Sequence, residues 1–322
     1  MPKTPSTLLE AIRYFANPDT CLEYMVESRW PDGVTCPTCD STEVSFLSTR
    51  RIWKCKNRHP KQQFSAKVGT IFEDSPIPLD KWLAAMWLIA NSKNGVSSYE
   101  MHRALGVTQK AAWFMLHRIR LVMHDDDSDK MDGPVEIDES YFGGKARNMH
   151  KSRRQRVFSG RQLKAGGPVG KTAVFGLLER HGPDGHSRVR AKTMKGTRAN
   201  DLIPEIRKNV QRGGEVYSDA FRTYTLLREE YVHEVVDHAE EYVRGKVHTN
   251  GIENFWSLLK RAIRGTYVAV EPFHLDAYID EQAFRYNNRH KFDGGRFQRV
   301  VGGIVGKRLT YAELTGAATT PA

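Results

Sequence analysis

The segment VEIDESYFGG, residues 135–144, decides the fold of the larger part of this chain. Glu136, Asp138 and Ser140 occupy alternate positions, apolar Val135 and Ile137 precede the first two of them, and a Gly-Gly pair then turns the chain, which predicts a β-strand. Because side chains on a strand alternate with a period of two, Glu136 and Asp138 are expected on the same face. Periodicity alone allows either acid to be a metal ligand, and a strand with two acids is most often an ordinary surface strand.

Two further acidic residues stand in other local settings farther along the chain. Asp219 ends a strand-like run in EVYSDAFRTY, residues 215–224, where it can equally cap the helix that follows. Glu253 opens a segment with helical periodicity in HTNGIENFWSLLK, residues 248–260. Two strand carboxylates and one helix carboxylate can converge on one point.

The segment that begins at Glu253 has the two faces of an amphipathic helix. Lys260 follows two turns after Glu253, so a metal ligand and a phosphate-binding cation share one stripe. The alternative is a solvated helix face that carries an acid and some bases. The expected apolar face consists of Ile252, Phe255, Leu259 and Ile263, and the expected polar face consists of Glu253, Ser257, Lys260 and Arg264.

Carboxylate oxygens are the ligands that Mg²⁺ and Mn²⁺ prefer. A pair of such ions about 4 Å apart can activate a nucleophile and stabilise the leaving oxygen in phosphodiester chemistry. Together, Asp138, Asp219 and Glu253 therefore indicate a nuclease or a strand transferase that uses two catalytic ions.

Three of the four cysteines and one histidine form a C-x2-C, x15, C-x3-H pattern made of Cys36, Cys39, Cys55 and His59. Thiolates and imidazole bind Zn²⁺ tetrahedrally, and one ion can fold a segment that is too small to fold by burial alone. We therefore predict one structural zinc ion. Disulfide bonds are the alternative, which the missing secretion signal disfavours. Cys21 lies in an apolar periodic segment and is expected to be a buried small hydrophobe.

A pair of short helices is predicted after an apolar helix that begins near Pro78. Ser97 starts a capping-box pattern for a helix that stops at Gly106, and Thr108 caps a second, basic helix. This order is typical of a helix-turn-helix, whose second helix lies in the major groove, although many helical hairpins share the pattern. The residues of the second helix expected to contact DNA are Gln109, Lys110, Trp113, His117 and Arg120.

The stretch from Lys145 to Lys171 carries nine Lys or Arg and no Asp or Glu, and glycines and a proline interrupt it. It is expected to be a flexible loop beside the acidic residues that binds a phosphate backbone, with Arg153, Arg154 and Arg156 as contacts. A solvated loop without a DNA role is the alternative.

The 322 residues carry 49 Lys plus Arg against 38 Asp plus Glu, a formal charge of +11, so a polyanionic partner is expected. The length suggests two or three domains. The longest apolar run, residues 82–90, is too short to span a bilayer, and the first residues lack the apolar segment of a signal peptide. These features predict a cytoplasmic protein.

Four longer motifs follow one another along the chain: VEIDESYFGGK (135–145), VYSDAFRTY (216–224), HTNGIENFWSLLKRAIRGTY (248–267) and YIDEQAFRYNNR (278–289). In this order they resemble the DDE transposases of bacterial insertion sequences, specifically the ISXO2-like group. The resemblance covers roughly residues 10–315. It implies that Asp138, Asp219 and Glu253 are the catalytic triad and that Lys260 is the basic residue that follows the last acid.

By this resemblance the protein binds double-stranded DNA at the ends of its element, cleaves it and transfers the liberated 3′ hydroxyl to target DNA. The catalytic cofactor would be Mg²⁺ or Mn²⁺, and the protein would act as a homo-oligomer on DNA in the bacterial nucleoid, with further DNA contacts from Arg261 and Arg264. Some members of the broader group replace the third acid with Asn or His, and both Asn250 and His248 stand just upstream as alternatives to Glu253. The family usually has a fourth Cys at the position of His59.

The resulting fold class is an α/β catalytic core, a ribonuclease-H-like mixed sheet flanked by helices, preceded by a small zinc ribbon and a helical DNA-binding domain. Strand-like runs at 172–178 and 188–194 and a helix at 199–210 precede the Asp219 strand, an order that this fold requires. It would bring Asp138 in the first strand beside Asp219 in the fourth. The expected domains are residues 1–72, 73–130 and 131–315, with a tail at 316–322.

Two other functions stay open at this point. One is a ribonuclease-H-like nuclease, and the other is a zinc-ribbon regulator that binds DNA without catalysis. A binding module has no need for three acids that face one point, and separate recognition modules before the catalytic domain favour the transposase.

Overall fold

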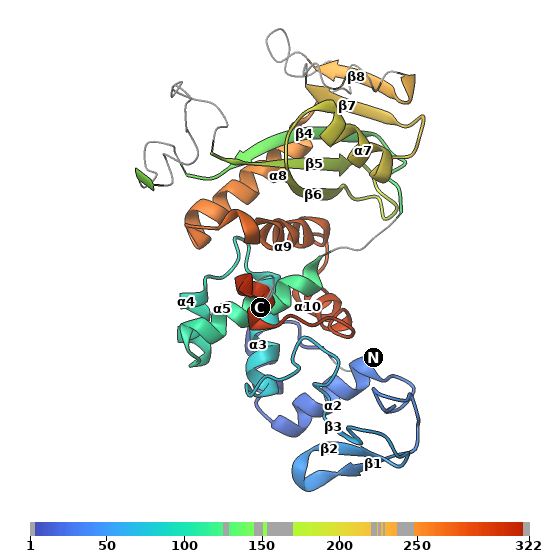
Figure 1. Ribbon diagram of the computed structural model, residues 1–322, viewed down its shortest axis with the longest axis vertical. Coiled ribbons are helices and arrows are strands. Elements are labelled where there is room, and N and C mark those ends of the chain that lie inside the picture. Colours follow the sequence, from blue (N-terminus) through green and yellow to red (C-terminus); the bar gives the residue numbers. More distant parts are fainter. Residues whose placement is uncertain are drawn as a thin grey trace. The chain divides into compact units, whose positions relative to one another are not determined.

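The computed structural model describes residues 4–124, 129–144, 151–152, 170–219, 224, 227, 229–236 and 248–317. The chain divides into two compact units, one drawn from residues 1–124 and 291–322 and the other from residues 125–290 (Figure 1). Most of the expected basic loop, including Arg153, Arg154 and Arg156, lies outside the described residues.

The C-terminal part of the chain belongs to the first unit and not to the expected domain of residues 131–315. Helix α10 (Asp293–Gly302) packs against α3 (Leu79–Asn91). Phe297 of α10 is fully buried, and its ring contacts the rings of Tyr24 and Trp87. Apolar burial therefore joins both ends of the chain in one core.

The cysteine pattern lies on a small antiparallel sheet made of β1 (Val44–Leu47), β2 (Ile52–Cys55) and β3 (Gln63–Phe64). The core beneath it is small. It consists of Trp53 on β2, Phe64 on β3, Ala66 and two of the cysteines, with Trp30 from the end of α2 (Pro18–Arg29) packed against them. A core of this size gives little stability by burial alone.

Helix α3 is the most apolar helix of the first unit, as the sequence predicted, and seven of its residues are buried. Its length is 13 residues, and no described helix of the chain is long and apolar enough to cross a membrane. The short helix α1 (Leu8–Tyr14) is capped by Thr7 and also contacts α3.

The two helices expected after the apolar helix are α4 (Ser98–Leu105) and α5 (Gln109–Met123). Ser97 and Glu100 form the predicted capping box, with donor–acceptor distances of 3.2 and 2.8 Å. Gly106 ends α4 in the left-handed conformation, with φ of 60°, and Thr108 caps α5. The short helix α11 (Tyr311–Thr315) packs on α5.

In the second unit, the described strands form one mixed sheet of five strands in the order β6-β5-β4-β7-β8. Strand β5 pairs antiparallel with both β4 and β6, whereas β7 runs parallel to β4, and β8 runs parallel to β7. The strands are β4 (Val135–Phe142), β5 (Thr172–Glu179), β6 (Arg188–Met194), β7 (Glu215–Asp219) and β8 (Val232–Val236).

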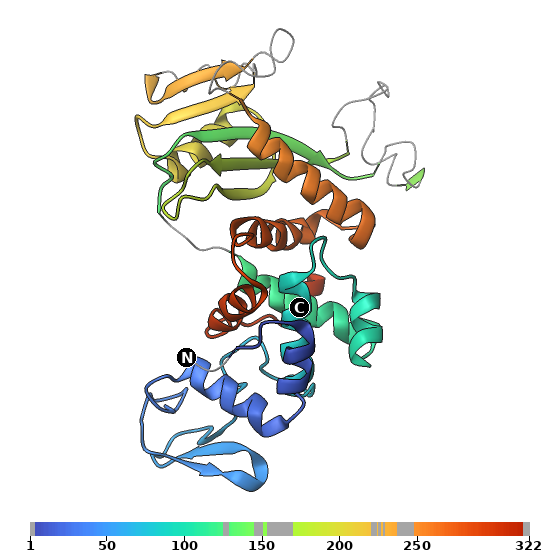
Figure 2. The same ribbon diagram turned by 180° about the vertical axis from the view of Figure 1, so that it is seen from behind.

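Helices cover both faces of this sheet (Figures 1 and 2). Phe175 and Leu177 of β5 point to a core formed with α7 (Ala199–Asn209). Val174 and Leu178, on the opposite face of the same strand, pack with α8 (Asn250–Arg261) and α9 (Leu275–Asn287). The alternation of side chains along one strand thus builds two cores.

Gly176 on β5 allows α8 to lie close to the sheet. It pairs with Asp138 across the β4–β5 ladder. A Cβ atom at this position would lie 2.6 Å from Cζ2 of Trp256 and 2.9 Å from Cδ1 of Ile252, both on α8. The missing side chain therefore makes the space that the Trp256 indole fills.

We predict that Gly176→Ala lowers the free energy of unfolding of the second unit by about 1–3 kcal/mol, because the indole and the backbone of β5 must move apart. Thermal unfolding followed by near-UV circular dichroism measures the change. Gly265→Ala is the matched control, since a Cβ there meets no atom within 4 Å. Equal melting temperatures for the two variants would contradict this account of α8.

Candidate functional site

The strand pairing brings Asp219 close to Asp138. Strands β4 and β7 are parallel, with Val135 opposite Val216 and Glu136 opposite Tyr217. Continuing this register brings Asp219, the last residue of β7, level with Asp138. Asp219 at the end of β7 therefore lies beside Asp138 in the middle of β4.

Glu253 approaches Asp138 from helix α8. The expected faces of this helix are observed: Ile252, Phe255 and Leu259 are buried, whereas Glu253 is exposed. The Thr249 hydroxyl donates a hydrogen bond of 3.2 Å to the Glu253 carboxylate. The structure thus brings together the three acids that the sequence singled out.

The three carboxylates repel one another. Burial raises the pKa of Asp138 to about 6, and the neighbouring charges of Asp219 and Glu253 act in the same direction. Hydrogen bonds from the Glu139 backbone N–H and from the Trp256 indole lower it in part. The site therefore disfavours a full set of ionised acids in the absence of a compensating positive charge.

Glu136, the second acid on this face of β4, is fully occupied in holding α8. Its side chain is 1% exposed, and one carboxylate oxygen accepts the backbone N–H of Ile252 at 2.8 Å. The other oxygen pairs with Arg180 at 2.6 Å, and Arg180 also donates to the backbone carbonyl of His248 at 2.5 Å. A negative charge here caps the N-terminus of α8, which favours Asp138 over Glu136 as the acid of the site.

A pocket of about 750 Å³ lies along α8 and the middle of β4. Lys260 lines it, and burial lowers the pKa of this side chain, with Arg264 and Lys171 acting in the same direction and Asp138 opposing them. The lining residues are Asp138, Glu139, Ser140, Glu253, Trp256, Ser257, Lys260, Arg261, Arg264 and Gly265. Acids at one side and bases at the other suit a phosphodiester with its metal ions.

Sequence reasoning missed two residues of this pocket. Trp256 donates its indole N–H to Asp138 Oδ2 at 2.9 Å, and it is one turn from both Glu253 and Lys260. Glu139 accepts a hydrogen bond from the Tyr224 hydroxyl, and burial raises the pKa of Glu139 to about 7. In the sequence, Trp256 only appears beside the apolar face of its helix, and Glu139 only appears at a strand position next to Asp138. Neither position tells which side chain the residue will hydrogen-bond.

Asn250, the alternative to Glu253, is the exposed first residue of α8. Its side chain does not line the pocket. The backbone turn that carries it is held by the buried Thr249, whose carbonyl accepts the Glu253 N–H at 3.1 Å. This placement favours Glu253.

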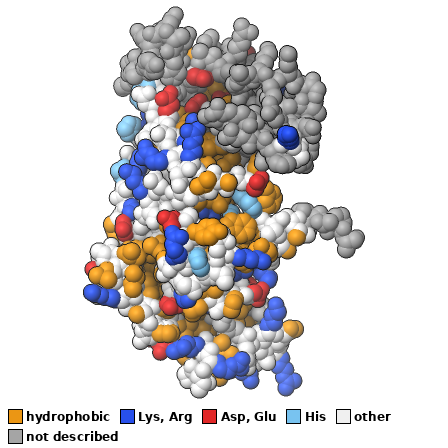
Figure 3. Space-filling view, turned by 90° about the vertical axis from the view of Figure 1, so that its left-hand side faces the viewer, with side chains coloured by type: hydrophobic (Ala, Val, Ile, Leu, Met, Phe, Trp, Pro, Cys, Tyr) orange, Lys and Arg blue, Asp and Glu red, His pale blue; other side chains and the backbone are white. Residues whose placement is uncertain are grey.

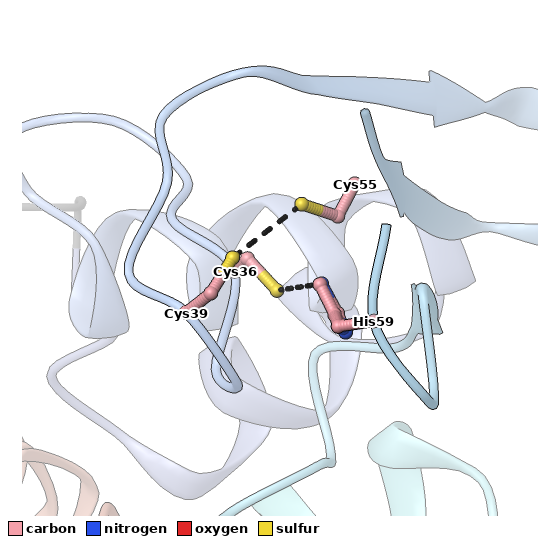
Figure 4. A group of neighbouring side chains, drawn as sticks. All are labelled: Cys36, Cys39, Cys55 and His59. Carbon is pink, nitrogen blue, oxygen red and sulfur yellow. Dashed lines mark hydrogen bonds between the residues drawn. The ribbon is translucent and has the colours of Figure 1, made fainter. Parts of the chain in front are cut away.

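The four expected zinc ligands form one cluster in the first unit (Figure 4). The ligand atoms of Cys36, Cys39, Cys55 and His59 all lie within 4.8 Å of one another. His59 Nε2 faces Cys36 Sγ at 3.4 Å, while its Nδ1 hydrogen-bonds the carbonyl of Pro60 at 2.7 Å. That second hydrogen bond orients the ring, as is usual for a zinc-bound histidine. The donor set and its spacing suit Zn²⁺.

Helix α5 does not present all five of its expected DNA contacts. His117 and Arg120 are 3% and 1% exposed, which corrects the face predicted for them. The reason is that α5 is packed by α3, α4, α10 and α11, so its buried stripe is wider than a simple amphipathic pattern suggests. Lys110 is exposed and lies over the Tyr311 ring at 4.4 Å, while Gln109 and Trp113 are half-buried.

Comparisons with known proteins agree with this architecture. The ISXO2-like transposase domain family matches residues 130–287, and the transposase zinc-ribbon domain family matches residues 16–57. An uncharacterised protein in transposable element ISH50 of Halobacterium salinarum is 30% identical over 260 residues, 78% of this chain and 84% of that protein. An uncharacterised transposase-like protein of Haemophilus influenzae is 33% identical over 88 residues, 27% of this chain and 71% of that protein. No solved structure matches.

A zinc-ribbon domain followed by an α/β domain with clustered carboxylates is the domain order of a DDE transposase. The chain belongs to the ISXO2-like transposase family.

We predict that protein purified without chelator contains about one zinc ion per chain and that Cys36→Ser loses it, because a hydroxyl is a poor replacement for a thiolate. Elemental analysis measures the ratio of zinc to protein. Cys21→Ala is the control, since this thiol lies outside the cluster and contacts the carbonyl of Phe15. Zinc-free wild-type protein, or full retention in Cys36→Ser, would refute the site. Faster release from His59→Ala under a chelator would assign the fourth ligand.

We predict that Asp138→Asn stabilises the protein at neutral pH without divalent ions. The pKa of Asp138 rises from 3.8 to about 6 on folding, so the stability that its neutral form contributes is full below pH 3.8 and is lost as the pH rises through 6. A permanently neutral Asn avoids that loss, which is on the order of 1–3 kcal/mol. Thermal unfolding at pH 7.5 and pH 4 checks this: the gain should vanish at pH 4. Asp132→Asn, at an exposed position, is the control.

Proposed function

We propose that the protein is the DNA transposase of an insertion sequence, which binds the ends of its element, cleaves them and joins the 3′ ends to target DNA. The observation that supports it most is the meeting of Asp138, Asp219 and Glu253 from β4, β7 and α8 beside Lys260. Family membership supports the same reaction class.

The acids would hold one or two divalent cations. Oxygen donors alone suit Mg²⁺ or Mn²⁺, and a cation would relieve the mutual repulsion that raises the pKa of Asp138. Bound there, the ions would supply activation of the attacking oxygen and stabilisation of the leaving one. Lys260 would hold a phosphate oxygen in place, and the Trp256 indole would keep the Asp138 carboxylate in one orientation.

We infer a ribonuclease-H-like core for the second unit. Three antiparallel strands followed by two strands parallel to the first agree with that order of elements. Helices on both faces of the sheet agree with it too. On the family's pattern this core would begin near residue 131, and we assign the residues from 291 onward to the first unit instead.

We assign DNA-end recognition to the first unit, through the zinc ribbon and the pair α4 and α5 acting as a helix-turn-helix. Lys110, Gln109 and Trp113 are the members of the expected contact set that reach the surface of α5. Basic side chains are spread over much of the described surface drawn in Figure 3. In the second unit, Arg261 and Arg264 beside the pocket, together with Arg153, Arg154 and Arg156, would bind the phosphate backbone. A homo-oligomer would bring two element ends together.

We predict that Asp138→Asn, Asp219→Asn and Glu253→Gln each lower Mg²⁺-dependent cleavage and joining at least about 100-fold, because each removes a charged ligand. Binding to the end DNA should stay within about twofold, since these acids contact metal and not base edges. Single-turnover assays on the DNA that flanks the element, with binding measured in parallel, separate the two effects.

Asn250→Ala is the matched control on the same turn of α8 and should cut normally. An inactive Asn250→Ala beside an active Glu253→Gln would move the third ligand to Asn250. Wild-type cleavage without joining would instead favour a nuclease, and end binding without either reaction would favour a regulator.

A further inference from the structure

The chain leaves α8 through a strained turn. The helix continues past Lys260 as a π-helical segment, η4 (Ala262–Tyr267), and then turns at Val268. The Val268 N–H donates to the Ile263 carbonyl at 2.8 Å, and the Ala269 N–H donates to the Tyr267 carbonyl at 2.7 Å. Val268 has φ of 62° and ψ of −59°, the conformation of a rare and strained type of γ-turn. A positive φ in a β-branched residue is a genuine outlier.

Burial does not offset this strain. The Val268 side chain is 75% exposed, so the residue gains little from packing in this position. Glycine adopts a positive φ without a steric cost, and an exposed position could carry it. An exposed, strained, β-branched residue is of the kind that persists at binding and catalytic sites.

Helix α9 contacts Tyr267, the residue before the tip of the turn. The Tyr267 hydroxyl donates to Glu281, and its ring contacts that of Tyr278 at 4.6 Å. Glu281 is fully buried and pairs with Arg285 on the same helix. The motif YIDEQAFRYNNR contributes no residue to the pocket, and these contacts give its Tyr278, Glu281 and Arg285 a supporting role. The residue before the exposed tip is therefore fixed to α9.

The surroundings of the turn carry positive charge. Arg264 and Gly265, three residues or more before the tip, line the pocket that contains the acids, and Arg261 and Arg264 are exposed. A second apolar side chain, Phe273, follows the tip and is 68% exposed. Exposed apolar side chains that follow two arginines beside the pocket match DNA, because the bases have apolar faces and the backbone is anionic.

We propose that the segment from Val268 to Phe273 is a wedge that packs against the bases next to the cleaved phosphate and holds them unstacked. This inference rests on the proposed function and adds the DNA state that the site takes. Arg261 and Arg264 would hold the backbone while Val268 replaces a stacking neighbour, as apolar wedges do in proteins that kink DNA. Separated bases make the phosphate accessible to the pocket.

Val268→Gly tests the wedge, because it removes the apolar tip and relieves the strain at once. We expect its melting temperature to rise, its cleavage of fully paired end DNA to fall about tenfold, and its cleavage of DNA with two mismatched pairs next to the cut to return to within about twofold of wild type. Val268→Asn, which tolerates a positive φ but is polar, should behave in the same way. Wild-type cleavage of paired DNA by both variants, or no rescue by mismatches, would overturn the proposal.

Base separation can also be read without any cleavage. End DNA with 2-aminopurine next to the cut should brighten on binding Asp138→Asn and stay dark on binding Asp138→Asn with Val268→Gly, at equal occupancy. Equal fluorescence in the two complexes would overturn the wedge. This measurement separates the two proposals. If the DNA brightens on binding but the wild-type protein never cuts it, the wedge proposal stands and the transposase proposal fails.

Discussion

The second unit depends on how α8 is fixed to strand β4. A buried carboxylate, Glu136, accepts the backbone N–H of Ile252 in the first turn of the helix, and Arg180 balances its charge. One turn farther on, Trp256 fills the space over Gly176 and donates to Asp138. These two attachments determine where the helix lies along the strand. Since α8 also carries Glu253 and Lys260, they determine the distance between the acids of the site as well.

The same arrangement stores electrostatic repulsion. Asp138 is half-buried beside two further acids, and its pKa of about 6 expresses the cost of ionising it there. Glu139, the next residue, is half-buried too, and its pKa is raised to about 7. A fold selected for stability alone would replace one of these acids, and the cations of the proposed function would relieve the repulsion between them. The turn at Val268 is also unfavourable by itself, because Val268 has a positive φ, a conformation that a β-branched residue disfavours. The contacts of the neighbouring residues with α9 maintain it.

The first unit reaches a stable structure by other means. Its small sheet has few buried apolar residues, and a zinc ion held by the Cys3His cluster would couple metal binding to folding. Next to it, α3 forms a dense aromatic and aliphatic core with α10, which comes from the other end of the chain. Closing that core between distant segments ties the C-terminal residues to the N-terminal ones.

Local pattern was enough to predict what depends on neighbours in the chain: the cluster of three cysteines and one histidine from its spacing, the two faces of α8, the capping box at Ser97 and the strand that carries Asp138. Only the tertiary structure decided what depends on partners far away. In the folded chain Glu136 accepts a hydrogen bond from the first turn of α8, and His117 and Arg120 are buried under other helices. Residues 291–317 belong to the first unit. The physical reason is that periodicity tells which side of an element is apolar, whereas the partner of a buried polar group is set by long-range packing.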